Sequence, residues 1–110
     1  MEGGVVVAMV TAPQGEGEKL AKRLLEKRVA ACVNVTSVRS AYWWQGRIEE
    51  GNEDLLIIKT SVEKVDALIR TVKSEHPYEV PEVLILPVVA CHADYCQWVR
   101  SETQGASSAE

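Results

Sequence analysis

The sequence predicts an α+β fold in which an antiparallel sheet carries two helices on one face. Short apolar segments of strand length alternate with two segments whose apolar residues recur at helical spacing. Proline, glycine and acidic turn residues separate these segments. Their order is strand, helix, strand, strand, helix, strand, and 110 residues are enough for one domain with one core.

The first strand is expected over residues 5–10, an apolar, valine-rich run that ends at turn residues 11–15. A run that is apolar on both faces favours a central place in the sheet. The first helix is expected over residues 16–28, because one stripe is apolar and the charged residues face outward. The stripe comprises Leu20, Ala21, Leu24, Leu25 and Val29.

A long hairpin is expected next. Strand character resumes at residue 30 and continues through Tyr42, Trp43 and Trp44 to residue 48. Residues 49–52, Glu-Glu-Gly-Asn, supply turn chemistry, and residues 54–60 return as the partner strand. Gly46, inside the first arm, is expected to mark a bulge or a close backbone approach.

The second helix is expected to run from a capping box to a proline stop. Residues 60–63, Thr-Ser-Val-Glu, have the form in which a hydroxyl and a carboxylate satisfy backbone amides at a helix start. Pro77 disfavours helical geometry at His76, so the helix should end there. His76 is thus held in a rigid bend, as a metal ligand or, more commonly, as a hydrogen-bonded structural imidazole.

The last strand is expected over residues 82–89, since Pro81 is tolerated only at the margin of a sheet or the start of a strand. A short terminal helix over residues 94–100 should dock through Tyr95, Trp98 and Val99. The whole chain, residues 1–110, is expected to be one domain with flexible termini at 1–4 and 103–110.

This order of elements is the split β-α-β arrangement of ferredoxin-like domains. The helices should cover one face of the sheet. Residues 55–58 and 83–86 are apolar on both faces, so one copy alone would leave a sizeable apolar surface. We therefore expect an oligomer.

Composition and charge exclude several classes of protein. An apolar content of 46% with 25% charged residues is ordinary for a globular protein, and a net charge of −4 argues against non-specific nucleic-acid binding. No run approaches the roughly 18 apolar residues of a membrane span, and the N-terminus lacks the basic start of a secretory signal. Cys32, Cys91 and Cys96 form an odd, sparse set, typical of reduced thiols. We expect a cytoplasmic protein, and an organelle after removal of a transit segment stays open.

Residues 30–34, 40–48 and 76–82, with Thr-Ala-Pro at 11–13 before them and Tyr95-x-x-Trp98 after, resemble the CutA divalent-cation tolerance family over about residues 5–102. The resemblance implies a homotrimer in which long hairpins reach neighbouring subunits, with Tyr42, Trp43 and Trp44 as core or interface anchors. It also implies a non-enzymatic role in divalent-metal binding and tolerance, with copper or another divalent cation as the metal and no organic cofactor.

The resemblance implies a metal site only in part. Bacterial members linked to copper carry a cysteine at the end of the first strand and two consecutive histidines before Pro-Tyr. This chain has Val10, Glu75 and His76 there. His76 with Glu75 would bind copper weakly, because several convergent donors are needed. Cys91 and His92 are a second candidate site, since thiolate and imidazole bind zinc or copper.

Two other functions are weighed. A sensor or adaptor resembling trimeric PII signalling proteins would bind a small molecule in clefts between subunits, with polar groups from Lys59, Glu63, Tyr78 and Glu82. An enzyme of acylphosphatase type would need backbone amides and an arginine around phosphate after the first strand. Residues 11–18 are acidic and lack arginine, so we expect no catalysis.

Overall fold

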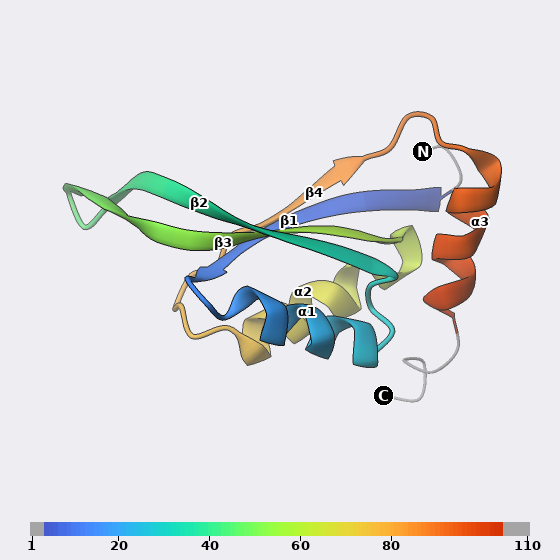
Figure 1. Ribbon diagram of the computed structural model, residues 1–110, viewed down its shortest axis with the longest axis horizontal. Coiled ribbons are helices and arrows are strands. Elements are labelled where there is room, and N and C mark those ends of the chain that lie inside the picture. The colour runs from blue at the N-terminus through green and yellow to red at the C-terminus, as the bar shows by residue number, and fades with distance from the viewer. Residues whose placement is uncertain (1–3, 105–110) are drawn as a thin grey trace.

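The computed structural model describes residues 4–104. Its strands are β1 (Val5–Pro13), β2 (Cys32–Trp44), β3 (Arg47–Ser61) and β4 (Val83–Pro87), and they form one antiparallel sheet in the order β2-β3-β1-β4. Helices α1 (Gly17–Glu26) and α2 (Val65–Glu75) lie side by side under one face, and α3 (Ala93–Glu102) stands at one end of the sheet (Figure 1). The predicted α+β, ferredoxin-like fold is confirmed.

The main core lies between the sheet and the helices α1 and α2. Alternate residues of the central strands, such as Val10 on β1 and its partner Leu56 on β3, point toward these helices and are fully buried. A second, smaller cluster of Val5, Cys96 and Val99 attaches α3. Since Val5 alternates with the residues that face α1 and α2, α3 covers one end of the opposite face.

The hairpin turn lies at Gln45-Gly46, and the expectation of a turn at residues 49–52 is wrong. Trp44 pairs directly with Arg47, and both turn residues have positive φ, 52° and 79°. A two-residue type I′ turn requires positive φ at both central residues, because its twist then matches that of the strands. Gly46 is therefore a turn residue rather than a bulge, and Gly51 lies inside β3 opposite Ser40.

The predicted capping box is also wrong. Thr60 belongs to β3, where it pairs with Val6, and its buried Oγ1 has no hydrogen-bond partner within residues 4–104. The chain enters α2 through a single 3-10 turn, η2 (Val62–Lys64), whose N-cap residue Ser61 makes no side-chain cap bond. The reason is that pairing between β1 and β3 extends to Ser61, so Thr60 stays extended.

The C-terminal flexibility expected from residue 103 does not apply to Thr103. Its side chain is buried, shares a 2.9 Å hydrogen bond with the Ser61 hydroxyl and donates to the Val99 carbonyl. Residues 1–3 and 105–110 lie outside the described residues. Tyr95 and Trp98, which were expected to dock α3, are 41% and 43% exposed, and their rings contact each other at 5.7 Å between centroids.

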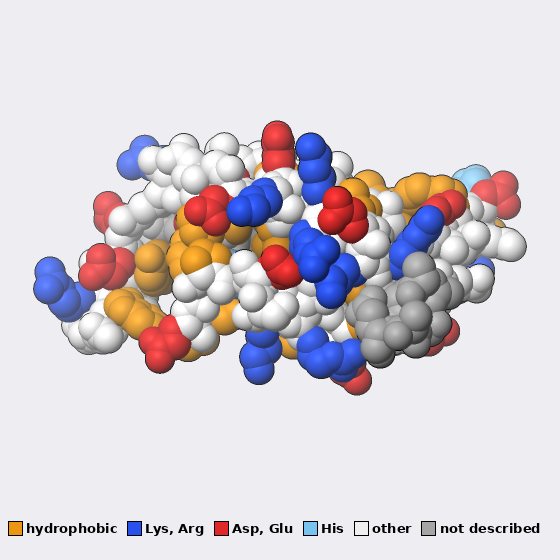
Figure 2. All heavy atoms as spheres, turned by 90° about the horizontal axis from the view of Figure 1, so that it is seen from below, with side chains coloured by type: hydrophobic (Ala, Val, Ile, Leu, Met, Phe, Trp, Pro, Cys, Tyr) orange, Lys and Arg blue, Asp and Glu red, His pale blue; other side chains and the backbone are white. Residues whose placement is uncertain are grey.

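The two faces of the molecule differ in polarity. Figure 2 looks onto the α1 and α2 layer from below and shows Lys, Arg, Asp and Glu side chains interspersed over it. The opposite face of the sheet is largely apolar. It carries Val7, Met9, Leu55, Ile57, Leu84 and Leu86, of which the two β4 leucines are 55% and 40% exposed. A single copy therefore presents the apolar surface that the sequence predicts.

Candidate functional site

His76 is placed where α2 gives way to the loop before β4. It adopts an extended conformation before Pro77, as predicted, and its imidazole is buried. Nε2 lies 2.5 Å from the Thr11 carbonyl oxygen, and Nδ1 accepts the Tyr78 backbone N–H at 3.1 Å. A carbonyl only accepts, so the ring carries its proton on Nε2. Pairing between β1 and β4 stops at Val10, and His76 binds the next strand carbonyl.

Both imidazole nitrogens of His76 are therefore occupied by hydrogen bonds to other groups of the same chain. Glu75, the other candidate ligand, accepts a hydrogen bond from Arg23 Nε on α1 at 3.0 Å. The hydrogen bond to Glu75 raises the pKa of Arg23 above its ordinary value. Within residues 4–104 no group of three His, Cys, Asp or Glu side chains is arranged to hold a metal ion. His76 and Glu75 instead link α2 to β1 and to α1, so a metal ion could bind them only by displacing these hydrogen bonds.

Tyr78 ties the loop after α2 to β3 as well. Its hydroxyl donates to Glu53 Oε2 at 2.9 Å, and its ring lies 4.6 Å from that of His76, centroid to centroid. Desolvation and the hydrogen bond to Glu53 raise the pKa of Tyr78 to about 12. The phenol is thus a neutral donor over the physiological range, and it fixes the loop against the face of the sheet opposite the helices.

The four residues predicted to line a ligand cleft do not converge within one chain. Lys59 donates to the side chain of Asn34 on β2 and, at 3.3 Å, to the Ile57 carbonyl. Lys59 and the Tyr78 partner Glu53 share one face of β3 but lie six residues, about 20 Å, apart. Glu63 lies in η2, and Glu82 is an exposed residue just before β4.

The three cysteines are not all reduced, contrary to expectation. Cys91 and Cys96 form a disulfide, with their Cα atoms 6.3 Å apart, and Cys32 is free. In this state Cys91 offers no thiolate, so the second candidate metal site at Cys91 and His92 lacks its sulfur ligand. His92 is the N-cap of α3, and its Nδ1 accepts from the Tyr95 N–H at 3.4 Å. The inference from reduced cysteines to a cytosol-like compartment therefore no longer holds.

Asp54 is a candidate functional carboxylate that the sequence analysis did not single out. Its Oδ2 accepts the backbone N–H groups of Gly15 and Gly17, at 3.0 and 2.8 Å, where α1 begins. A Cβ atom on Gly17 would lie only 2.8 Å from both Asp54 Cβ and Val35 Cγ1, so this approach needs glycine. The amides that a phosphate-binding loop would offer after β1 are thus occupied by the chain's own carboxylate.

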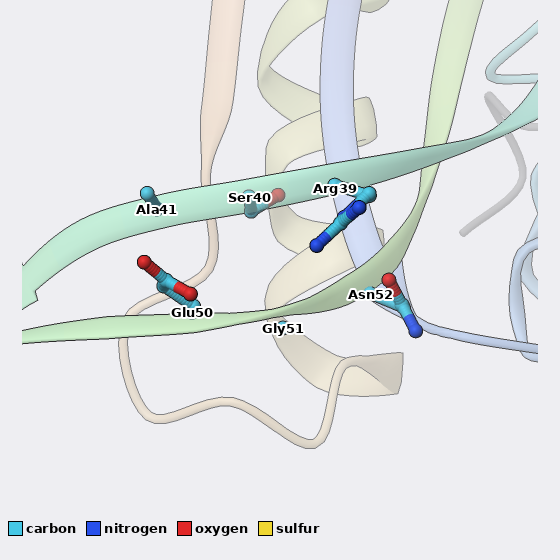
Figure 3. A pocket seen from close by; sticks show the side chains of 6 residues that line it. All are labelled: Arg39, Ser40, Ala41, Glu50, Gly51 and Asn52. Atoms are coloured by element: carbon cyan, nitrogen blue, oxygen red, sulfur yellow. The ribbon is translucent and has the colours of Figure 1, made fainter.

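A shallow hollow of about 450 Å³ lies on the hairpin ribbon, away from His76 (Figure 3). It is lined by three directly paired positions, Arg39 with Asn52, Ser40 with Gly51, and Ala41 with Glu50. Gly51 opens the space, because no atom lies within 4 Å of the position that its Cβ would take. None of the predicted site residues lines it.

A family model described as CutA1 divalent ion tolerance protein matches residues 5–102. The chain belongs to this family. Among curated CutA relatives, a rice protein named Protein CutA 1, chloroplastic, is 41% identical over 101 residues, covering 90% of this chain and 57% of its own. The human Protein CutA is 46% identical over 107 residues, covering 96% and 60%. The chain thus spans about three fifths of the length of these two CutA relatives.

Solved CutA structures share the fold. The periplasmic divalent cation tolerance protein CutA from Archaeoglobus fulgidus has a TM-score of 0.88 and 36% identity, covering 91% of this chain and 99% of its own. A protein from Nostoc sp. PCC 7120 described as PII-like protein CutA, in apo form, has a TM-score of 0.87 and 33% identity, covering 90% and 97%. Among the described residues, no helix has the length and apolarity to cross a bilayer.

Proposed function

We propose that this chain acts as a non-enzymatic, trimeric protein of divalent-cation tolerance, with copper as the cation. The observation that carries the proposal is the family match over residues 5–102. The local chemistry agrees with a role outside catalysis, because Asp54 occupies the amides after β1 that phosphoryl chemistry would need.

A homotrimer is supported by what one copy leaves uncovered. The sheet face opposite α1 and α2 carries exposed leucines on β4, and β2 and β4 are open edges of the sheet. Near the hairpin tip, Tyr42, Trp43 and Trp44 are 47%, 72% and 43% exposed, so they are not part of this chain's core and are the proposed interface anchors. A closed three-fold assembly covers such edges without leaving one free for further growth.

The oligomer is tested by light scattering coupled to size exclusion. With a chain mass of 12.1 kDa, a trimer has a mass of about 36 kDa. Trp43→Glu should lower the mass, because it places a charge on the most exposed of the three aromatics. Leu25→Glu on α1, at a residue that was predicted in the apolar stripe but is 39% exposed, is the matched control and should leave the trimer intact. A folded wild-type chain of monomer mass would refute the assembly.

Copper is proposed to bind at His76 with Glu75, and only weakly. The ion would have to displace the Tyr78 N–H from Nδ1 and compete with Arg23 for the Glu75 carboxylate. Calorimetric titration with copper and zinc tests this. Saturable binding should be lost in His76→Ala and retained in His92→Ala, an exposed imidazole that serves as the control. Binding indifferent to His76→Ala would refute the site, with circular dichroism used to confirm that each variant folds.

The second candidate is a sensor or adaptor that binds a small molecule between subunits. It is favoured by the likeness to the Nostoc protein described as PII-like, and by the position of Lys59 and of the Tyr78–Glu53 pair on the sheet face opposite α1 and α2. Because Lys59 and the Tyr78–Glu53 pair lie about 20 Å apart in one chain, they would have to form a cleft together with groups of a neighbouring subunit. Glu63 and Glu82 would contribute at the edges of that cleft. A thermal-shift screen of nucleotides and metabolites tests this, and a flat response to all of them would remove it.

A cytoplasmic location stays a prediction. The names of two similar proteins refer to the chloroplast and the periplasm. Fractionation of the source cells, followed by detection of this chain with an antibody, is the direct test.

A further inference from the structure

The segment from residue 91 to residue 96 places two cysteines in unequal environments at the start of α3. Cys91 lies just before the N-cap residue His92 and is partly exposed. Cys96 lies one turn into the helix and is 2% exposed, packed with Val5 and Val99. The two sulfurs are joined in a disulfide that spans five positions.

This inequality decides which sulfur can react. Thiol–disulfide exchange needs an accessible sulfur for the attacking thiolate, and of the two residues Cys91 is partly exposed whereas Cys96 is buried. A thiolate set free at Cys91 would lie at the N-terminus of a ten-residue helix, where unsatisfied amides and the helix dipole stabilise negative charge. Cys96 is then the buried leaving group on attack and the resolving thiol on return.

The rest of α3 is held by contacts that do not involve the disulfide. Val99 is fully buried, and the Thr103 hydroxyl bonds to that of Ser61. Arg28 Nη1 contacts both the carboxylate and the carbonyl of Glu102, each at 2.9 Å. The C-terminal half of α3 is therefore fixed independently, so the bond can open and close without release of the helix.

We infer that Cys91 and Cys96 form a redox-active couple that exchanges electrons with small-molecule thiols and disulfides of the glutathione class. A thiolate attacks the Cys91 sulfur, the bond between Cys91 and Cys96 breaks, and Cys96 leaves as a thiolate. A second thiolate attacks the small-molecule sulfur of the resulting mixed disulfide and releases Cys91. Two thiols are oxidised to one disulfide, the protein gains two electrons, and two protons complete the cysteine thiols. This activity does not depend on cation binding or on the proposed function.

The test uses the full chain carrying Cys32→Ser, which leaves only the pair. The protein is equilibrated in glutathione buffers from both the oxidised and the reduced side, quenched with acid, alkylated and weighed by mass spectrometry. The oxidised fraction should follow the ratio of glutathione disulfide to the square of glutathione, with the same curve from both directions. A pair that stays wholly oxidised or wholly reduced throughout, or curves that do not meet, would overturn the inference.

Trapping the mixed disulfide tests the assignment of roles. With Cys96→Ser, glutathione disulfide should modify Cys91, while with Cys91→Ser the buried Cys96 should be modified more slowly by about tenfold or more. Equal rates would overturn the role of Cys91 as the exchanging sulfur. Far-ultraviolet circular dichroism of both variants shows whether each keeps the secondary structure of the wild type, and the wild-type equilibrium decides the couple itself whether or not they fold.

Discussion

Replacement of Asp54 by alanine should destabilise the protein by about 3 kcal/mol. The variant loses two hydrogen bonds to one carboxylate, from Gly15 N–H and Gly17 N–H, each worth about 1.5–3 kcal/mol when the acceptor is charged. Water can reach Gly15, which is exposed and lines an open hollow, but Gly17 is buried and its amide would stay unsatisfied. Because water can replace the carboxylate at Gly15, the expected loss of stability lies at the lower end of the range for two such hydrogen bonds.

The assay is urea unfolding at a fixed protein concentration, because any assembly makes apparent stability depend on concentration. Asp54→Asn keeps the shape and one accepting oxygen, so it should cost about half as much as alanine. Asp66→Ala, an exposed carboxylate in the first turn of α2, is the matched control and should cost no more than about 0.5 kcal/mol. An Asp54→Ala variant within that margin of the wild type would refute the reasoning.

Three further outcomes are expected. Tyr78→Phe should lower the Tm below pH 10, where the neutral phenol donates to Glu53. Since the folded pKa of Tyr78 is raised to about 12, the wild-type advantage should disappear as pH rises from 10 through 12. A difference in Tm that stays constant over this pH range in thermal scans would contradict the prediction. Thr60→Val should stabilise by about 1 kcal/mol in urea unfolding, because it replaces a buried hydroxyl that lacks a partner in the described structure, whereas a loss would mean that the hydroxyl is bonded. Gln45→Asn should stabilise by about 0.5 kcal/mol in the same assay, because asparagine tolerates the positive φ of a type I′ turn better than glutamine does, and no gain would argue against that turn.

The parts of the fold that follow from local sequence were predicted well. The end of α2 at Glu75 follows from Pro77, and the buried stripe of α1 follows from helical spacing, except at Leu25, which is 39% exposed. The hairpin turn was misplaced because Glu-Glu-Gly-Asn at 49–52 has stronger turn chemistry than Gln45-Gly46, and only strand register decides between them. α1 ended early, at Glu26, because Arg28 adopts a positive φ of 60° that no local residue type signals.

The site residues depend on contacts between distant parts of the chain. His76 was predicted to be rigid, but its partner, the Thr11 carbonyl, lies 65 residues away. Asp54 caps a helix that begins 37 residues before it, so no capping pattern in the sequence reveals it. The disulfide was missed because three cysteines give no pairing by count, and the proximity of Cys91 to Cys96 depends on the loop before α3.

The ribbon of β2 and β3 projects well past the helices (Figure 1), and its aromatic tip has no support from the main core of its own chain. Under the proposed trimeric assembly, a newly synthesised copy exposes this aromatic tip until it meets other copies of the chain. Low expression or strong dilution would prolong that interval. A longer interval favours chaperone binding and aggregation through exposed strand edges over assembly. Under that proposal, the cellular concentration of the chain, and not its sequence alone, determines how much of it assembles and how much aggregates.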